Sequence, residues 1–462
     1  RPPGLAMPAP SPSIGYGRLV ERKPGPPDRP AGRDDLPAQE RANQSHLRAG
    51  SKEDAEDPMV GQQPVAVPQE AYDAQTAVPE PEKRVPAQVE SGVDPAWLAE
   101  RSRDLDLVLD QYGIKAYDVD PAAADVGPSI IRFKIRLRSG ERLARLQNVA
   151  EDVGRELALH GIPLISNVYG TSYVSIDLPR PTSETVSLLS LLADLPEPEP
   201  GELPVVLGET PDGRVIVEDL SEFPHLLVGG ATNSGKSVFL RSLLLCLMAR
   251  HGPDEVALLV VDPKRTDFSF FDAVPSYLLG GSVITDGEEA RDALLSLVRE
   301  EMPRRQRVMA GRSLRVKDFN RRYPREALKP IVAVIDEYAQ LISVMSRAER
   351  ETFERDLMSL AQVARSTGIH LVLATQRPSA DIVTGTLKAN LPAGIAFKVA
   401  GSVNSRIVID QNGAENLLGR GDMLFKRPSG EVFRLQAPFL SEEELADYLS
   451  RFGEPHDPAP GR

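Results

Sequence analysis

The stretch His225-Leu-Leu-Val-Gly-Gly-Ala-Thr-Asn-Ser-Gly-Lys-Ser237, followed by the apolar run 238–249, decides the fold of this chain. An apolar strand, a glycine-containing loop and a helix in this order fit the pattern G-x-x-x-x-G-K-[ST] in full. The glycines let the backbone curl so that successive N–H groups face a phosphate, and the helix N-terminus adds its dipole. A glycine-rich turn without a ligand is the weaker alternative, because strand and helix flank the loop. The predicted nucleotide-binding residues are Gly230, Ala231, Thr232, Asn233, Ser234, Gly235, Lys236 and Ser237.

Roles within this loop follow from the chemistry of its last two residues. Lys236 is expected to reach the β- and γ-phosphates, and the Ser237 hydroxyl to ligate Mg²⁺. A second apolar strand, Ile331–Ile335, ends in Asp336 and Glu337. Adjacent carboxylates at the end of a buried strand are costly unless they hold a cation, so Asp336 is predicted to orient Mg²⁺. Glu337 is predicted to act as general base on the attacking water, although a strand that ends in acids at a turn is the structural alternative.

A third apolar strand, His370–Ala374, ends in Thr375-Gln376-Arg377. The corresponding edge of a P-loop sheet faces the γ-phosphate, so Gln376 is a candidate for placing the water. A capping role at the strand end is the alternative. Short β-type runs that alternate with helical stretches predict an α/β fold with a central parallel sheet and crossover helices. These runs are Leu226–Val228, Val256–Val261, Ile331–Ile335, His370–Ala374 and Ile395–Val399.

Length and composition suggest two or three domains in 462 residues. The first 90 residues hold 16 of the 41 prolines and no Phe or Trp, so residues 1–92 are predicted to be a disordered proline-rich linker. Residues 93–181 are predicted to form a small α/β domain, with a helix from Asp94, helical spacing at 143–160, and strands at 130–137 and 173–178. The main α/β domain is placed at 195–449 and a polar tail at 450–462.

Charge and cysteine content exclude several classes of protein. The single cysteine, Cys246, excludes a disulfide framework and a thiolate zinc site, and favours a cytoplasmic location. The net charge of −13 argues against a broadly basic surface but leaves room for basic loops. The alternating strand Arg132–Arg138 presents a basic face, for which nucleic-acid contact and simple solvation both stay open. The apolar run 238–249 is short and interrupted by Arg241, which excludes a membrane span.

Residues 224–437 closely resemble the motor domain of the FtsK/SpoIIIE DNA translocases. The resemblance rests on the loop and the Asp336-Glu337 strand, and on Asp262-Pro-Lys264, 367–379, 384–390, Asn404-Ser-Arg406 and 417–424. It implies a RecA-like P-loop ATPase motor, with residues 94–180 similar to the family's alpha domain. It further implies a homo-hexamer that binds ATP and Mg²⁺ and pumps double-stranded DNA non-specifically through the ring pore. Chromosome segregation at cell division and DNA transfer both suit such a motor.

Further residues take roles from the resemblance alone. Arg365 is similar to the arginine that reaches into a neighbouring subunit's ATP site. Arg377 and Lys388 match basic residues of loops that line the pore and contact DNA phosphates. Ser402 stands where family members usually carry a lysine, and Asn404 stands where they carry an aspartate. One cation that the resemblance would lead us to expect at the DNA is therefore missing.

Two alternatives stay open at this point. The first is an FtsK-like ATPase that moves protein or a conjugative relaxosome, and the second is a catalytically silent scaffold. Many family members carry a membrane anchor ahead of a proline-rich linker, so the resemblance also leaves open an anchor upstream of Arg1 and a position at the inner face of the cell membrane.

Overall fold

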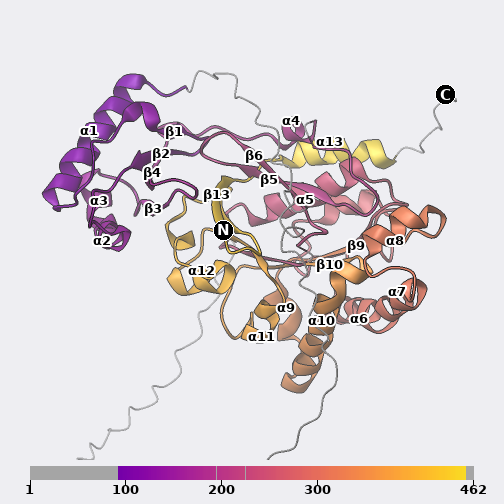
Figure 1. Ribbon diagram of the computed structural model, residues 1–462. Helices are drawn as coiled ribbons and strands as arrows, with labels where there is room; N and C mark the ends of the chain where they lie inside the picture. The colour runs from indigo at the N-terminus through magenta and orange to yellow at the C-terminus, as the bar shows by residue number, and fades with distance from the viewer. Residues whose placement is uncertain (1–91, 194, 224, 454–462) are drawn as a thin grey trace, which may run out of the picture. The chain divides into compact units, whose positions relative to one another are not determined.

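The computed structural model describes residues 92–193, 195–223 and 225–453 (Figure 1). The predicted linker, apart from Gly92, and most of the predicted polar tail lie outside the described residues. The described residues form two β-sheets with separate apolar cores. The predicted division into domains at 93–181 and 195–449 stays a prediction.

A four-stranded sheet has the order β1-β2-β4-β3 and is antiparallel at each pairing. Its apolar side chains and those of the helix α1, including Leu105, Ile131, Phe133 and Ile176, form one core. The helix predicted over 143–160 is wrong in its extent, because it is broken at Val149 and the second piece ends at Glu156. The elements are α1 (Pro95–Gln111), β1 (Asp125–Val126), β2 (Ile130–Ile135), α2 (Leu143–Asn148), α3 (Ala150–Glu156), β3 (Leu164–Asn167) and β4 (Val174–Pro179).

The cations of the basic strand β2 are engaged within this sheet. Arg132 forms a two-point ion pair with Asp177 on β4, and Lys134 pairs with Asp125 on β1. Arg136 lies over the ring of Tyr117. Arg132 and Lys134 therefore have ion-pair partners within the sheet, whereas the sequence had left open nucleic-acid contact and simple solvation for this strand face.

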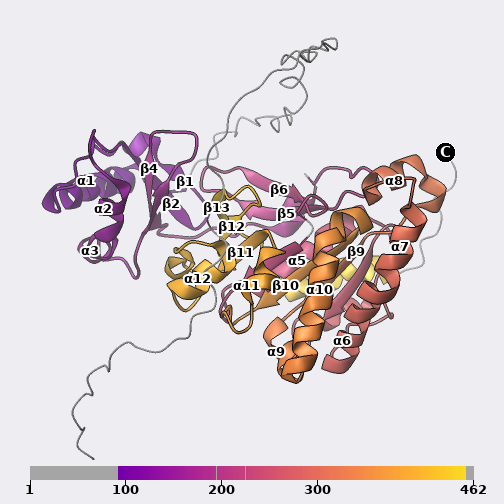
Figure 2. The ribbon, with the colours of Figure 1, turned by 60° about the horizontal axis from the view of Figure 1, so that its bottom comes forward.

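The nine-stranded sheet has the order β6-β5-β13-β12-β11-β7-β10-β9-β8 (Figures 1 and 2). The five strands from β11 to β8 pair in parallel, which confirms the predicted parallel sheet. The other four strands pair antiparallel and were not predicted. The strands are β5 (Pro204–Glu209), β6 (Val215–Asp219), β7 (His225–Gly229), β8 (Ala257–Val261), β9 (Ile331–Ile335), β10 (Ile369–Thr375), β11 (Ala393–Phe397), β12 (Asp422–Lys426) and β13 (Val432–Gln436).

Helices cover both faces of the parallel strands, which explains why these strands are continuously apolar. Alternate residues face opposite ways, so that Leu226 and Val228 pack with α5 while Leu227 packs with the helices of the other face. One face carries α5 (Lys236–Arg250) and α13 (Glu442–Gly453), and the other carries α6 (Gly287–Ser296), α9 (Tyr338–Ser343) and α10 (Arg347–Thr367). The remaining α-helices of the described residues are α4 (Leu188–Leu192), α7 (Met302–Met309), α8 (Val316–Arg322), α11 (Gly385–Ala389) and α12 (Ser402–Ile409).

None of the helices in the described part of the chain is long and apolar enough to cross a bilayer. Cys246 is buried on α5, and burial raises the pKa of its thiol to about 12.

Candidate nucleotide site

The loop between β7 and α5 is fixed by backbone hydrogen bonds to three other segments. Gly230 donates to the carbonyl of Thr375, Ala231 donates to that of Lys398, and the Ser234 carbonyl accepts from Gly421 at 2.8 Å. Gly235 adopts φ +108°, and a Cβ there would lie 2.5 Å from the Gly421 nitrogen. Only glycine fits this position. The loop is therefore a preformed cradle whose shape depends on the start of β12.

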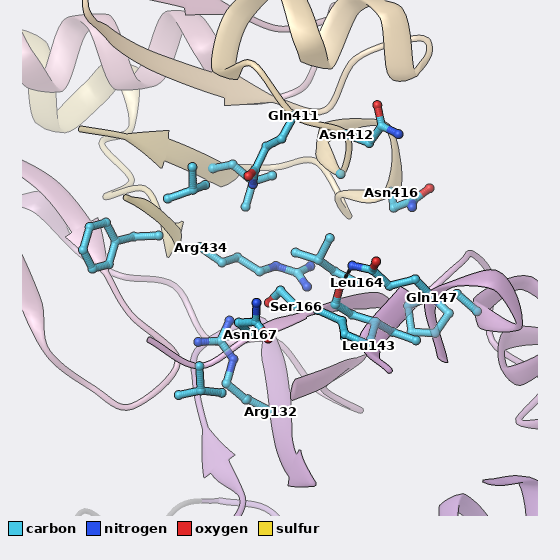
Figure 3. Close-up of a pocket in the computed structure, with 18 of the residues that line it drawn as sticks. Arg132, Leu143, Gln147, Leu164, Ser166, Asn167, Gln411, Asn412, Asn416 and Arg434 are labelled. Atoms are coloured by element: carbon cyan, nitrogen blue, oxygen red, sulfur yellow. Dashed lines mark hydrogen bonds between the residues drawn. The ribbon is translucent and has the colours of Figure 1, made fainter. Parts of the chain in front are cut away.

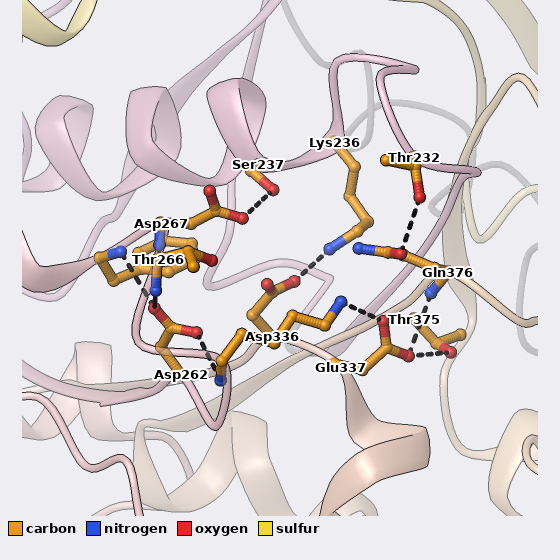
Figure 4. A network of polar contacts seen from close by, with 12 residues as sticks. Thr232, Lys236, Ser237, Asp262, Thr266, Asp267, Asp336, Glu337, Thr375 and Gln376 are labelled. Atoms are coloured by element: carbon orange, nitrogen blue, oxygen red, sulfur yellow. Dashed lines mark hydrogen bonds and ion pairs between the residues drawn. The ribbon is translucent and has the colours of Figure 1, made fainter. Parts of the chain in front are cut away.

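Lys236 and Asp336 form a buried ion pair at the centre of the site (Figure 4). Burial raises the pKa of the Asp336 carboxyl above its ordinary value, and the Lys236 ammonium offsets only part of this rise. Within the described residues, Asp336 Oδ2 and Ser234 Oγ are buried and have no hydrogen-bond partner. A buried carboxylate oxygen without a partner is costly unless a ligand satisfies it. These atoms therefore fit a bound polyphosphate with its magnesium ion.

Glu337 lies at the end of β9 with its carboxylate held from both sides. Its Oε1 accepts hydrogen bonds from Thr375 Oγ1 at 3.1 Å and from the backbone N–H of Gln376 at 3.3 Å. Its Oε2 accepts from Lys264 Nζ at 3.0 Å. The backbone of Glu337 is left-handed, at φ +63°. Such strain in a residue with a long side chain is typical of functional sites, where surrounding contacts maintain it.

Gln376 and Ser237 complete the arrangement from the two ends of the site. Thr232 Oγ1 donates to Gln376 Oε1 at 3.1 Å, which joins the loop to the end of β10. Ser237 Oγ donates to Asp267 Oδ2 at 2.6 Å. The structure thus brings Thr232, Lys236, Ser237, Asp336, Glu337 and Gln376 together at the carboxyl ends of the parallel strands (Figure 4). Sequence reasoning assigned no role to Asp267, Lys264 or Thr375, although the Asp262-Pro-Lys264 motif pointed to this segment.

The two residues predicted to contact DNA, Arg377 and Lys388, both lie on the segment between β10 and β11. Arg377 is exposed. Lys388, on α11, donates to the Arg406 carbonyl at 2.6 Å and is ion-paired with Asp410, which also pairs with Lys426. Asn404 Nδ2, on α12, donates to the Pro378 carbonyl at 2.8 Å. Asn404, which stands where the family has an aspartate, therefore links α12 to the segment that carries Arg377.

Two further predicted positions have simple locations. Ser402 is the first residue of α12. Arg365 belongs to α10, but its side chain lies outside the described residues.

A cleft of about 810 Å³ lies away from these residues, between the two sheets (Figure 3). Its lining includes Arg132, Arg434 and several side-chain amides. The guanidinium of Arg434, on β13, donates to Asp177 on β4 and to Asp422 on β12. Since the arginines that line it, Arg132, Arg214 and Arg434, are all paired with carboxylates, we assign the cleft no nucleotide.

Comparison with known proteins gives two matches to family models. Residues 193–380 match the FtsK/SpoIIIE family, and residues 83–180 match the FtsK alpha domain. The DNA translocase FtsK of Pseudomonas aeruginosa is 36% identical over 392 residues, covering 78% of this chain and 47% of that protein. The DNA translocase SftA of Bacillus subtilis is 38% identical over 372 residues, covering 79% and 38% respectively. The chain therefore spans less than half the length of either relative.

Two solved structures share the fold. The conjugation coupling protein TcpA of pCW3, solved as a monomer with ATPγS, has a TM-score of 0.53 at 24% identity and covers 77% of this chain and all of that chain. The cytoplasmic domain of the type VII secretion ATPase EccC of Thermomonospora curvata has a TM-score of 0.51 at 26% identity, covering 60% and 35%.

Proposed function

Because this chain belongs to the FtsK/SpoIIIE family, we propose that it is the motor part of an ATP-driven translocase of double-stranded DNA. The observation that carries this proposal is the assembly of Lys236, Ser237, Asp336 and Glu337 at one edge of the parallel sheet. A scaffold without catalysis has no need of this set. The proposal places the activity in the cytoplasm, where the one buried thiol fits a reducing compartment.

The chemistry assigned to the site is hydrolysis of the γ-phosphate. Lys236 exchanges its ion pair with Asp336 for contacts to the β- and γ-phosphates, while the preformed loop cradles them through backbone N–H groups. Ser237 and Asp336 are the residues that would hold Mg²⁺, which would offset the charge of the phosphate oxygens. Glu337 takes the proton of the attacking water, and Gln376, fixed by Thr232, orients that water.

DNA contact is assigned to Arg377 and Lys388. Cations on loops that surround a duplex grip its phosphates, which gives affinity without sequence preference and a strong dependence on salt. A few loop cations per subunit suffice in a homo-hexameric ring, so the overall net charge of −13 is compatible with this role. Arg365 is assigned to the ATP site of the neighbouring subunit, where an arginine stabilises the transferring phosphoryl group.

Steady-state ATPase measurements with and without linear duplex at low salt test the proposal. We expect turnover that duplex stimulates, and loss of turnover in Lys236→Ala with retained secondary structure. Wild-type turnover in Lys236→Ala would refute the nucleotide site. Turnover that depends on Lys236 but ignores duplex would favour the alternative in which protein or a relaxosome is the cargo. The match of residues 83–180 to the FtsK alpha domain supports DNA.

A further inference from the structure

The segment that follows β8 is a turn built around one buried carboxylate. Asp262 is fully buried, and its Oδ1 accepts from the Lys264 amide at 3.1 Å. Its Oδ2 accepts from the amides of Thr266, Asp267 and Phe268 at 3.0, 3.0 and 3.2 Å. A carboxylate that binds four backbone N–H groups fixes the path of the chain around it. The positions of the side chains on this turn are therefore set before any ligand binds.

One side chain of the turn reaches the predicted general base. Lys264 Nζ donates to Glu337 Oε2 at 3.0 Å, while Thr375 and the Gln376 amide bind the other oxygen of the same carboxylate. The Glu337 carboxylate is thus bound by residues at or just after the ends of β8 and β10, which are the two neighbours of β9 in the sheet (Figure 4). A carboxylate bound at both oxygens has a fixed plane and a fixed distance from the phosphate-binding loop.

A second side chain of the same turn reaches the opposite half of the site. Asp267 Oδ2 accepts a hydrogen bond from the Ser237 hydroxyl, with 2.6 Å between the two oxygens. With its proton directed to Asp267, the Ser237 oxygen has its lone pairs available for a cation. One turn, organised by Asp262, therefore contacts both the residue assigned to the base and a residue assigned to Mg²⁺.

We propose that Lys264 is a positioning residue that holds Glu337 in the geometry needed for water activation, with Asp267 as its counterpart toward Ser237. This inference rests on the proposed function, because it gives Glu337 the role of base. A general base works only within hydrogen-bond reach of the water proton, and an error of about 1 Å in placement costs on the order of 100-fold in rate. Lys264 acts through Glu337 and not on the nucleotide.

Comparison of Lys264→Ala, Lys264→Arg and Arg265→Ala tests this role. Arg265 is the exposed cation next to Lys264 on the same turn and serves as the matched control. For Lys264→Ala we expect kcat to fall about 10- to 100-fold, with KM and the dissociation constant of a fluorescent ATP analogue within about twofold of wild type. Lys264→Arg should restore part of the rate, because arginine can still donate to the carboxylate. Arg265→Ala should retain the wild-type rate.

A double-mutant cycle separates positioning from direct phosphate contact. If Lys264 acts through Glu337, then single-turnover hydrolysis by Lys264→Ala/Glu337→Gln should equal that of Glu337→Gln alone. A further loss in the double variant, or weaker binding of the ATP analogue in Lys264→Ala, would overturn the inference and make Lys264 a phosphate ligand. Full turnover in Lys264→Ala, with Glu337→Gln inactive, would also overturn it while leaving the proposed function intact. Wild-type turnover in Glu337→Gln would instead overturn the base itself, and the inference with it.

Discussion

Two aspartates of this protein are equally buried, at 1% exposure for Asp336 and 2% for Asp177, yet their carboxylates have opposite surroundings. Asp336 is ion-paired with Lys236, and its Oδ2 has no hydrogen-bond partner among the described residues. Asp177 accepts three hydrogen bonds from Arg132 and Arg434. Burial by itself would raise the pKa of both carboxyls. The pKa of Asp336 is indeed raised, whereas at Asp177 the two guanidinium groups outweigh burial and the pKa is lowered.

The difference separates a carboxylate that stabilises the fold from one that is kept for a ligand. Arg434 donates hydrogen bonds to both Asp177 and Asp422, so this network joins β4 of one sheet to β12 and β13 of the other. Asp336 lies at the carboxyl ends of the parallel strands, and only one of its two buried carboxylate oxygens has a partner, which is energetically costly. Natural proteins accept such costs at functional sites and recover them elsewhere in the fold. The same substitution at both positions should therefore have opposite consequences.

The largest effect is expected for Asp336→Asn, on turnover. Asparagine keeps the size of the side chain but loses the charge that would hold Mg²⁺, so we expect kcat to fall by at least about 10³-fold, or roughly 4 kcal/mol in activation free energy. The free energy of unfolding should fall by no more than about 1 kcal/mol, because the raised pKa of the Asp336 carboxyl means that its charged form adds no net stability to the fold. ATPase assays and urea unfolding on one preparation measure both. A stability loss as large as that of the Asp177 variant would contradict the distinction.

The next effect is expected for Asp177→Asn, on stability. Removing this charge leaves Arg132 without its ion-pair partner and Arg434 with only Asp422, which should cost about 2–4 kcal/mol. Turnover per folded molecule should stay within about twofold of wild type, since Asp177 contacts none of the residues assigned to catalysis. Urea unfolding and ATPase activity at a temperature well below the transition test this. Loss of turnover without loss of stability would give the network a functional role.

Most of the parallel sheet was predictable because strands buried on both faces are continuously apolar, as in Ile331–Ile335. The antiparallel strands were missed, although β5 and β12 each hold a short apolar run, Val205–Leu207 and Met423–Phe425. Val215–Asp219 on β6 has no buried residue, and Asp422–Lys426 on β12 begins with an ion-paired aspartate. Their place in the sheet depends on pairing with distant segments, which a local pattern does not contain.

The candidate site likewise has a part that the sequence predicts and a part that depends on the fold. The loop and the Asp336-Glu337 strand carry their chemistry in adjacent residues, so the sequence predicts their roles. Lys264 lies more than 70 positions before Glu337 and reaches it only because β8 and β9 are neighbours in the sheet. Likewise, the contact of Asn404 with the Pro378 carbonyl depends on how α12 packs and has no sequence signal.

A smaller effect is expected in the acid dependence of stability. An aspartate whose folded pKa is lowered stabilises the fold fully above its unfolded-state pKa of about 3.9, and this contribution disappears as the pH falls through the folded value. The difference in unfolding free energy between wild type and Asp177→Asn should therefore be constant above about pH 5 and shrink below about pH 4. Urea unfolding at a series of pH values measures it. A difference that shrinks between pH 7 and pH 5 would assign the effect to another group.

The smallest effect is expected at an exposed charge cluster, which extends the comparison from buried to solvated pairs. Asp410 pairs with Lys388 and Lys426, and its side chain is 51% exposed. Exposed pairs contribute about 0–1 kcal/mol, so Asp410→Asn should barely change stability. Asparagine also tolerates the left-handed backbone of this position, at φ +63°.

DNA binding should respond more than stability in this variant. If Lys388 grips phosphate, Asp410 competes with DNA for its ammonium, and Asp410→Asn should raise affinity for linear duplex about two- to fivefold at low salt. Fluorescence anisotropy at two salt concentrations measures this. Asp447→Asn removes the same charge from an exposed pair with Arg451 on α13 and is the matched control. An equal gain in both variants would reflect net charge alone and would remove Lys388 from the DNA contact.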